Sequence, residues 1–499
     1  MPGQRTVLNA LLVLFLALPL QAAQDSRELL RKEAGGREGQ GKEVHSEKAP
    51  GKELRLLFTG DILLSRQVQD EWTRRRQSPW GGFVELFRSA DWVGGNLEGV
   101  RGEPAACVDS KSPCFPISSQ ALALLAEAGF AAVTQENNHA GDLGPDARRH
   151  TYAALAGQGV LGLDFARSPQ FFRRGETTIA LISLSLVPAA DGQVQQIPSL
   201  ALAQKLRLAG ALANLVVVSV HWGQELVDWP NAQQRSGAAW LVRNGADLVL
   251  GHHPHVVQPA ECVAGKPVFF SLGNHLFDQK YPQTKQGAIA DCCVSGGKLA
   301  CTSLATRTPP GSTYPQLLPE SPAAALDCAV NLRADLSLDG VAIRPQPWSA
   351  EVPTDTLALE GWKDGKRQWR SRRQRILSLQ RTDLAGAGQP PLLFTLEQHD
   401  SPLDMASGVR PYVYAVGPHG LVAKWRGSAL AWPLLDAVAE PGDDGSLLCA
   451  LHRGDSFVVL DPQTKTRRTA AYRWNGFGFS GVEGEAGAVC ARRYAEPPP

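Results

Sequence analysis

The feature of the sequence that most constrains its fold is a series of apolar runs that each end in polar residues. The clearest example is segment 249–256, where His252, His253 and His255 directly follow an apolar run. Short apolar runs of this kind are typical of buried strands. Ligands of open α/β sheets lie at the carboxyl ends of strands, and imidazole is a common metal ligand. The segment therefore predicts a metal-binding loop, with a histidine-rich surface loop as the alternative.

Polar residues follow the other apolar runs of the first half of the chain in the same way. A single Asp or Asn after a strand is more often a helix cap than a ligand. A parallel sheet, however, brings such strand ends to one edge, so a repeated pattern predicts one shared site. Carboxylate, amide and imidazole groups together suit Zn, Mn or Fe. The polar residues at the strand ends are Asp61, Glu98, Asn138, His139, His221, Glu225, Asn274 and Asp278.

Strand-like and helix-like segments alternate between residues 54 and 304, which predicts an α/β domain with a parallel or mixed sheet. The expected helices lie between the apolar runs and have an amphipathic pattern. Strands are expected at 54–59, 131–134, 178–187, 215–220, 247–250 and 268–271, and helices at 119–128, 145–156, 200–209 and 232–242.

The chain has 499 residues and a formal net charge of +1. Its length predicts two or three domains. A charge so close to zero gives no field that would attract nucleic acid, so we expect no nucleic-acid partner.

The N-terminal region has the pattern of an export signal. Residues 1–23 combine an early cation, an apolar run and small residues, as in a signal peptide; an uncleaved membrane anchor is the alternative. Residues 24–53 are charged and almost free of large apolar residues, which predicts a disordered linker. We therefore expect a periplasmic or secreted protein.

The nine cysteines fit an oxidising compartment. We expect pairs between Cys107 and Cys114, between Cys301 and either Cys292 or Cys293, and between Cys449 and Cys490. Because nine is odd, at least one thiol stays free.

The C-terminal half changes in composition. Residues 305–390 predict an irregular linker or extension. Within it, the cationic stretch 363–375 has the pattern of a solvated helix face, with a binding patch as the alternative. Residues 391–499 contain short β-like runs, among them 392–396, 412–416, 447–451 and 457–460, and predict a small β-rich domain of propeller-style hairpins.

The strand-end motifs of residues 54–304 resemble those of the CapA family, which is named for poly-γ-glutamate capsule synthesis and is related in fold to calcineurin-like metallophosphoesterases. The resemblance rests on their order and spacing. The motifs are Thr59-Gly60-Asp61, Gly95-Asn96-Leu97-Glu98, Asn137-Asn138-His139, Ser219-Val220-His221-Trp222-Gly223-Gln224-Glu225, Gly251-His252-His253-Pro254-His255 and Ser271-Leu272-Gly273-Asn274.

The resemblance implies a metallophosphoesterase-like αββα sandwich with one or two divalent metal ions at the strand ends. Asp61 and His255 would hold the first metal, and Glu98 would bridge the two. The second metal would be held by Asn138, His221 and His253. We assign His253 and not His252, because its spacing to His255 reproduces the His-x-His arrangement of the family, and this leaves His252 without a role.

The remaining motif residues would act on the substrate or support the ligands. His139 would donate a proton to the leaving group or stabilise negative charge. Arg66 could bind an anionic substrate, although a surface cation is an equal alternative. Glu225 could orient His221, and Asn274 and Asp278 would fix loops.

Two departures from the phosphoesterase pattern leave the activity open. Leu63 stands where those enzymes have a histidine, and Glu98 replaces an aspartate. The resemblance implies a metal-dependent hydrolase or transferase of an anionic envelope polymer or a phosphate ester. The alternative is a non-catalytic component that binds the polymer and works with envelope biosynthesis or export machinery.

Overall fold

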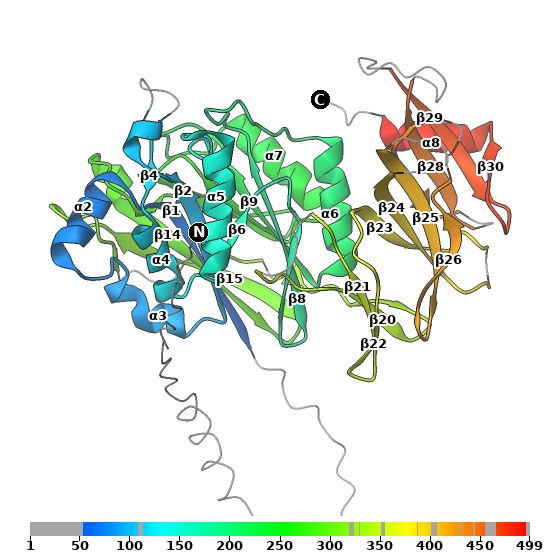
Figure 1. Cartoon of the computed structure of the whole chain (residues 1–499), viewed down its shortest axis with the longest axis horizontal. Helices are drawn as coiled ribbons and strands as arrows, with labels where there is room; N and C mark the ends of the chain where they lie inside the picture. Colours follow the sequence, from blue (N-terminus) through cyan, green and yellow to red (C-terminus); the bar gives the residue numbers. More distant parts are fainter. Residues whose placement is uncertain are drawn as a thin grey trace, which may run out of the picture. The chain divides into compact units, whose positions relative to one another are not determined.

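A computed structural model describes residues 53–495 except 108–112, 319–323, 329, 351–354, 387, 401–406, 429, 431, 443–444 and 455–465. The predicted signal peptide, most of the predicted linker and the β-like run 457–460 therefore lie outside the described residues. Residues 51–499 form one compact unit, in which helices and strands alternate in the first half and strands dominate the second (Figure 1).

Two β-sheets form the centre of the first half of the molecule. The first sheet is mixed, with β14 antiparallel and β2 parallel to β1. It consists of β1 (Leu54–Leu63), β2 (Trp92–Glu98), β5 (Ala132–Thr134), β6 (Leu161–Leu163), β13 (Asn274–Leu276), β14 (Gln286–Ser295), β15 (Lys298–Arg307), β16 (Gln316–Leu317), β17 (Ala324–Ala325) and β18 (Val330–Asn331).

The second sheet has a parallel centre, in which β8, β9, β10 and β12 run side by side. Its strands are rich in β-branched residues, which favour extended backbone. It consists of β7 (Gln170–Arg174), β8 (Thr177–Ser185), β9 (Leu215–His221), β10 (Leu248–His252), β11 (Val257–Val263) and β12 (Lys266–Leu272).

The two sheets pack face to face, and helices cover both outer faces. Leu56 and Phe58 of the first sheet share one apolar core with Val217 and Leu250 of the second. A separate core joins the outer face of the first sheet to α2 (Arg66–Arg75), α3 (Val84–Arg88), α4 (Ser119–Ala128) and α5 (Gly144–Gly157). The outer face of the second sheet packs on α6 (Leu200–Leu212) and α7 (Ala232–Arg243). This confirms the expected αββα sandwich.

Local sequence signals fix the ends of the main helices. The Ser118 side chain accepts a hydrogen bond from the Ala121 amide at the start of α4, and Gly129 ends this helix in the left-handed conformation. Asn231 and Gln234 form a capping box at the start of α7. The four helices that the sequence predicted lie where it placed them, whereas α2 and α3 were not predicted.

The second half of the chain forms two antiparallel sheets, which confirms the expected C-terminal β structure (Figure 1). The smaller sheet contains β19 (Leu336–Leu338), β20 (Val341–Pro345), β21 (Leu359–Lys363) and β22 (Lys366–Arg370). The larger contains β23 (Ile376–Thr382), β24 (Leu392–Asp400), β25 (Ser407–Gly417), β26 (Gly420–Arg426), β27 (Leu434–Glu440), β28 (Leu447–Arg453), β29 (Arg467–Trp474) and β30 (Phe479–Val482), and α8 (Glu485–Tyr494) follows it.

Two expectations for this half were wrong. The stretch 363–375 is not a helix face but runs through the β21–β22 hairpin, whose strand β22 exposes its cations and buries Trp369. Residues 305–390 are also less irregular than expected, because they contain the small sheet and β23. These strands pack on α6 through a shared apolar core that includes Ile343, Leu359 and Leu379. The domain limits themselves stay predictions.

Four disulfides cross-link the described residues, and three of them confirm expected pairs. They are Cys107–Cys114, Cys292–Cys301, Cys449–Cys490 and the unexpected Cys262–Cys328. Cys293 keeps a free thiol.

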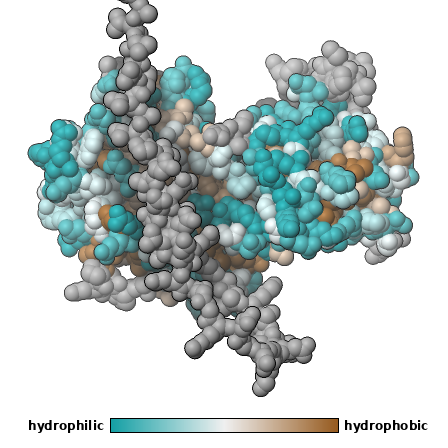
Figure 2. Space-filling view, turned by 60° about the horizontal axis from the view of Figure 1, so that its bottom comes forward, coloured by the Kyte–Doolittle hydropathy of each residue, from teal (hydrophilic) through white to brown (hydrophobic). Residues whose placement is uncertain are grey.

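The surface of the described part is largely polar. Hydrophilic residues cover much of the coloured area in Figure 2, with smaller hydrophobic areas between them. Large exposed apolar side chains such as Trp229 and Phe477 are scattered in the sequence. None of the helices in the described residues has the length and apolar character needed to cross a membrane.

Candidate metal centre

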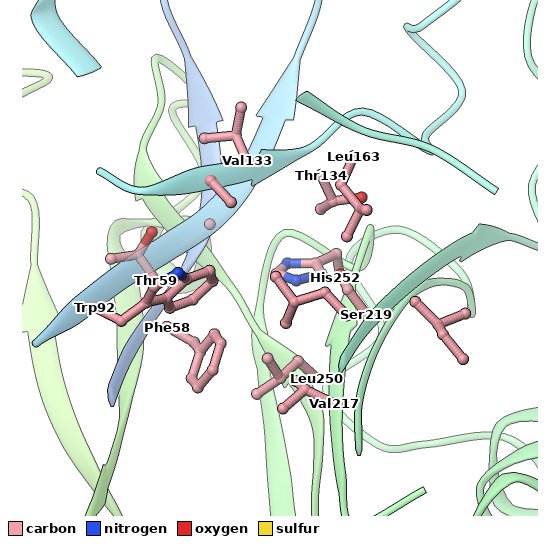
Figure 3. Close-up of a pocket in the computed structure, with 14 residues that line it drawn as sticks. Phe58, Thr59, Trp92, Val133, Thr134, Leu163, Val217, Ser219, Leu250 and His252 are labelled. Atoms are coloured by element: carbon pink, nitrogen blue, oxygen red, sulfur yellow. The ribbon is translucent and has the colours of Figure 1, made fainter. Parts of the chain in front are cut away.

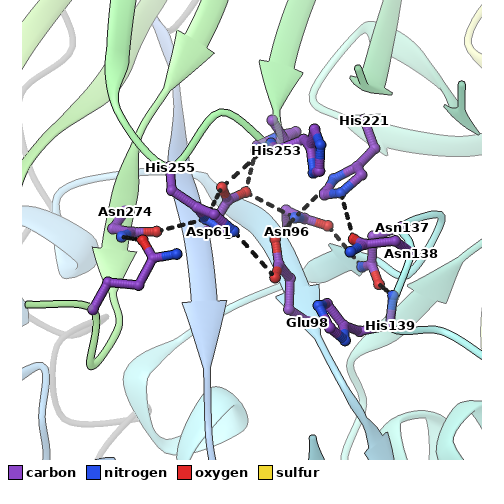
Figure 4. Close-up of polar contacts among 12 residues, drawn as sticks. Asp61, Asn96, Glu98, Asn137, Asn138, His139, His221, His253, His255 and Asn274 are labelled. Carbon is purple, nitrogen blue, oxygen red and sulfur yellow. Dashed lines mark hydrogen bonds and ion pairs between the residues drawn. The ribbon is translucent and has the colours of Figure 1, made fainter. Parts of the chain in front are cut away.

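The strand ends of both sheets converge on one buried polar cluster, as the sequence predicted. Asp61 at the end of β1 pairs in register with Asn96 on β2 and with Asn274 on β13. In the second sheet, His252 at the end of β10 lies beside His221 at the end of β9. The cluster therefore draws on both sheets (Figure 4).

The amide of Asn96 joins the two carboxylates of the cluster. Its Nδ2 donates to Asp61 Oδ1 at 2.8 Å and to Glu98 Oε1 at 3.3 Å. Its Oδ1 in turn accepts a hydrogen bond from Asn137 Nδ2 at 3.0 Å. All four side chains are fully or almost fully buried. Asn96 thus fixes both acids in place, a role that sequence reasoning missed although its motif was noted.

Two glycines let the backbone come close enough to build the cluster. A Cβ atom on Gly60 would lie 2.0 Å from Gly273 O, and one on Gly251 would lie 1.9 Å from Phe270 O. Any larger residue at either position would push neighbouring strands apart. The close approach at Gly60 allows the Asp61 amide to donate to Gly273 O at 2.9 Å.

His253 and His255 lie in a strained turn. Their φ angles are 97° and 59°, in the left-handed region that residues with a Cβ rarely adopt. Backbone strain of this kind concentrates at functional sites. The turn directs the His253 amide to Asp61 Oδ2 at 3.3 Å and places His255 Nδ1 3.1 Å from the same oxygen.

The predicted ligands of the second metal also lie together. His221 Nε2 lies 2.9 Å from Asn138 Oδ1, and the rings of His221 and His253 are 4.7 Å apart between centroids. His255 Nε2 faces Glu98 Oε2 at 3.9 Å, and its Nδ1 bonds Asn274 Oδ1 at 2.9 Å. Asn274 therefore orients His255.

The two buried carboxyl groups differ in protonation. At Asp61, burial favours the neutral acid, but contacts with His252 and His255 outweigh it and hold the pKa well below its ordinary value. At Glu98, burial dominates over the opposing charge of His255, and the pKa rises to about 8. At neutral pH and without a metal, Asp61 carries the negative charge and Glu98 keeps its proton.

The buried histidines of the cluster also differ in protonation. Burial lowers the pKa of His255, but the neighbouring Glu98 and Asp61 outweigh burial and raise it to about 9. Burial, reinforced by His255, lowers the pKa of His253 to about 4. Burial and His253 hold the pKa of His221 well below its ordinary value. His221 and His253 are therefore neutral, the state in which imidazole binds metals.

The cluster fits a metal ion. Ligand atoms of Asp61, Glu98 and His221 all lie within 4.8 Å of one another. Glu98 Oε2 and His253 Nδ1 are buried and have no hydrogen-bond partner among the described residues. Buried polar atoms are rarely left without a partner, so these two atoms indicate a missing ligand. Without a metal, the protonated His255 supplies the positive charge that a bound metal ion would supply.

His139 lies at the edge of the cluster and is held by Asp142 and by Phe115, of which only Phe115 was not foreseen from the sequence. Its Nδ1 lies 3.0 Å from Asp142 Oδ2, which also accepts the Phe115 amide at 2.8 Å. The Phe115 ring stacks on the His139 ring at a centroid distance of 3.8 Å. These contacts fix the imidazole so that its Nε2 is left for a substrate.

Arg66 and Asp278 form one unit on the far side of Phe115. The guanidinium lies 4.4 Å from the Phe115 ring centroid, and its Nε donates to Asp278 Oδ2 at 3.0 Å. A second bond joins Arg66 Nη2 to Asp278 Oδ1. Asp278 thus orients Arg66 rather than only fixing a loop. A bidentate carboxylate holds the guanidinium over the ring that covers His139.

Two predictions about the site need correction. Glu225 is exposed on the loop after β9, and the described partners of His221 are Asn138 and Asn96, the latter at 3.5 Å. His252 is not without a role, because its Nδ1 lies 3.2 Å from Asp61 Oδ1. The wrong assignments have one cause: sequence spacing does not show which way a side chain points after a strand ends.

His252 also lines a small cavity between the two sheets (Figure 3). The cavity measures about 30 Å³, and its wall is mainly apolar, with Thr59, Thr134 and Ser219 as further polar members. A space of this size and polarity has room for about one water. His252 therefore supports Asp61 from the interior of the sandwich, and the cavity is too small to be the substrate site.

With this fold and cluster in view, comparison with known proteins defines the class of protein. Residues 55–279 match the family model described as "Bacterial capsule synthesis protein PGA_cap". This segment carries every predicted ligand of the cluster. This part of the chain therefore resembles the capsule synthesis family.

Two curated relatives match the same part of the chain. The PGA biosynthesis protein CapA of Bacillus subtilis (strain 168) is 30% identical over 259 residues, which cover 47% of this chain and 66% of the relative. The capsule biosynthesis protein CapA of Bacillus anthracis is 26% identical over 270 residues, 47% of this chain and 62% of the relative. The chain thus spans less than two thirds of the length of these relatives.

One solved structure is also similar. It is the crystal structure of TT1561 of Thermus thermophilus, with a TM-score of 0.30 and 14% identity over 49% of this chain and 98% of that one.

Proposed function

We propose that the protein is an exported, metal-dependent hydrolase or transferase that acts on an anionic envelope polymer of the poly-γ-glutamate type. The observation that carries the proposal is the buried cluster of Asp61, Glu98 and His221 within the segment that matches the capsule synthesis family. The names of the relatives, which refer to capsule and PGA biosynthesis, supply the polymer class. The signal-like residues 1–23 support export.

The chain would bind one or two divalent ions, of which Mn, Zn and Fe suit the donors best. Such ions generate a hydroxide and stabilise charge on the reacting group. The protein would hold them through Asp61, Glu98 and His255 on one side and through the His221, Asn138 and His253 set on the other. His139 would give a proton to the leaving group from Nε2, because Asp142 engages its Nδ1 and fixes the ring.

A groove next to the metal centre supports an anionic polymer as the proposed substrate. The groove measures about 610 Å³ and is lined by the cations Arg74, Lys280, Lys285 and Arg307. Three carboxylates also line it, Asp70, Glu71 and Asp278. Glu71 is engaged by Thr313 and Asp278 by Arg66. Burial lowers the pKa of the Lys285 ammonium, which an anion in the groove would offset.

The test combines metal analysis with a chain-length assay. The purified protein is incubated with poly-γ-glutamate and Mn²⁺ or Zn²⁺, and the size of the polymer is followed by gel electrophoresis. We expect bound metal and a change in polymer length, both lost in Asp61→Ala and His253→Ala. Glu127→Ala, at an exposed position of α4 that lines neither the cluster nor the groove, is the matched control and should behave as the wild type. Unchanged activity in metal-free protein and in both site variants would overturn the proposal.

A second candidate is a non-catalytic component that binds or guides the polymer. The observation in its favour is Leu63, which is fully buried in the apolar core beneath the helices and offers no nitrogen to the first metal. In this case His139→Ala should keep its biological function. Loss of function in that variant, with fold and polymer binding intact, would favour the enzyme. Turnover of aryl phosphates would point instead to a phosphate ester substrate.

A further inference from the structure

A second basic pocket lies away from the metal centre, where α6 meets the start of β23 (Figure 1). It measures about 90 Å³ and is shared by the loop before β7, α6, the segment after β20 and the start of β23. Four cations line it, Arg167, Lys205, Arg373 and Arg375, against the single acid Asp355. None of the residues of the metal cluster takes part.

Lys205 is a cation without a carboxylate partner among the described residues. Its Nζ donates to Ser168 O at 2.6 Å and to Ala166 O at 3.3 Å, and it lies 4.9 Å from the Phe165 ring centroid. An ammonium has three donors, so one is left for a ligand. Burial lowers the pKa of Lys205 to about 8. The charges of Asp164 and Glu136 oppose this shift only in part.

Two arginines of the turn before β23 add further charge. Arg373 is held in place by its neighbours, with Nη1 donating to Gln346 Oε1 at 2.8 Å and Nε to Thr356 Oγ1 at 3.1 Å, and Asp355 offsets part of its charge. Arg375 forms no ion pair within the described part of the chain, and its charge lowers the pKa of Lys205 further. Like charges gathered in this way are unfavourable unless an anion lies between them.

The fourth cation is already neutralised. Arg167 Nε donates to Asp164 Oδ2 at 3.0 Å, and its guanidinium stacks 3.4 Å from the Tyr152 ring centroid. It shapes the wall of the pocket and leaves Lys205, Arg373 and Arg375 as the groups that would meet a ligand.

We propose that this pocket binds a small oxyanion, a phosphate or a carboxylate group, between Lys205, Arg373 and Arg375. The anion would receive charge-assisted hydrogen bonds from all three side chains, which are the strong type of hydrogen bond. A pocket of about 90 Å³ suits one such group and not a large cofactor. The site is independent of the function proposed for the metal centre.

The experiment measures binding of inorganic phosphate and of glutarate to the chelator-treated protein by isothermal titration calorimetry. The two anions distinguish a phosphate from a carboxylate ligand. The variants are Lys205→Met, which keeps the length of the side chain, and Arg375→Gln at an exposed position. Arg243→Gln, an exposed arginine at the end of α7, is the matched control.

We expect at least one of the anions to bind the wild type and the control equally, and each pocket variant to weaken binding by roughly tenfold or more, the value of one charged hydrogen bond. If Lys205→Met does not fold, Arg375→Gln alone decides. Absence of binding of both anions to the wild type, or equal binding to wild type and Arg375→Gln, would overturn the proposal.

Discussion

Metal binding to the cluster should release protons, because the metal-free site holds protons where a cation belongs. The pKa of Glu98 is raised to about 8 and that of His255 to about 9, and both groups must lose their proton to bind a metal. Both pKa values lie above neutral pH, so metal affinity rises with pH and levels off only above the second value. At pH 7 the two deprotonations together cost roughly 4 kcal/mol, or about a thousandfold in affinity.

The assay is calorimetric titration with Mn²⁺ between pH 6.5 and 8.5 in pairs of buffers with different ionisation enthalpies. The wild type should release about two protons per bound metal at the acidic end and fewer as the pH rises. Glu98→Gln should release about one proton fewer, whereas Glu127→Gln, an exposed carboxylate on α4, should match the wild type. An affinity that does not change with pH, with no proton release, would refute the reasoning.

Three further predictions concern stability, each read from urea denaturation. Asn96→Ala should lower the free energy of unfolding by about 2–3 kcal/mol, because it strips a buried donor from two acids; an unchanged value would show that this amide does not hold them. Burial raises the pKa of Glu136 to about 7, so ionising it costs stability as pH rises from 5 to 8, by up to roughly 3 kcal/mol. Glu136→Gln should remove this loss of stability between pH 5 and 8; identical stability–pH profiles of the variant and the wild type would count against the raised pKa. Replacing Cys262 and Cys328 by Ser should cost about 4 kcal/mol, because their disulfide closes a 66-residue separation; a loss below about 1 kcal/mol would contradict this value.

Short-range patterns were sufficient to predict an α/β domain with polar residues at its strand ends, whereas the two-sheet sandwich was implied by the resemblance to the CapA family. Apolar runs predicted the strands, and polar residues after them predicted a shared edge. In the structure, Asp61, Asn274 and His221 indeed lie at neighbouring strand ends. The left-handed turn at His253 and His255 could not be foreseen from residue types alone.

What the sequence could not give were contacts between distant segments. Asn96 holds the two acids only because β1 and β2 pair in one particular register. Phe115 reaches His139 from a loop distant in sequence, and nothing in its local sequence marks it. The β21–β22 hairpin was taken for a helix face, because a cation-rich stretch with a single large apolar residue has no periodicity that separates a helix from a strand. The structure shows that this residue, Trp369, is buried.

The central claim is that the strand ends of the two sheets form a metal site. The most direct test is a crystal structure of the protein soaked with Mn²⁺ or Zn²⁺, read by anomalous scattering. The account predicts one or two metal peaks in contact with Asp61, Glu98 and His221, and none in the His221→Ala variant. A wild-type crystal without a peak at these residues, at metal concentrations that saturate the calorimetric titration, would contradict it.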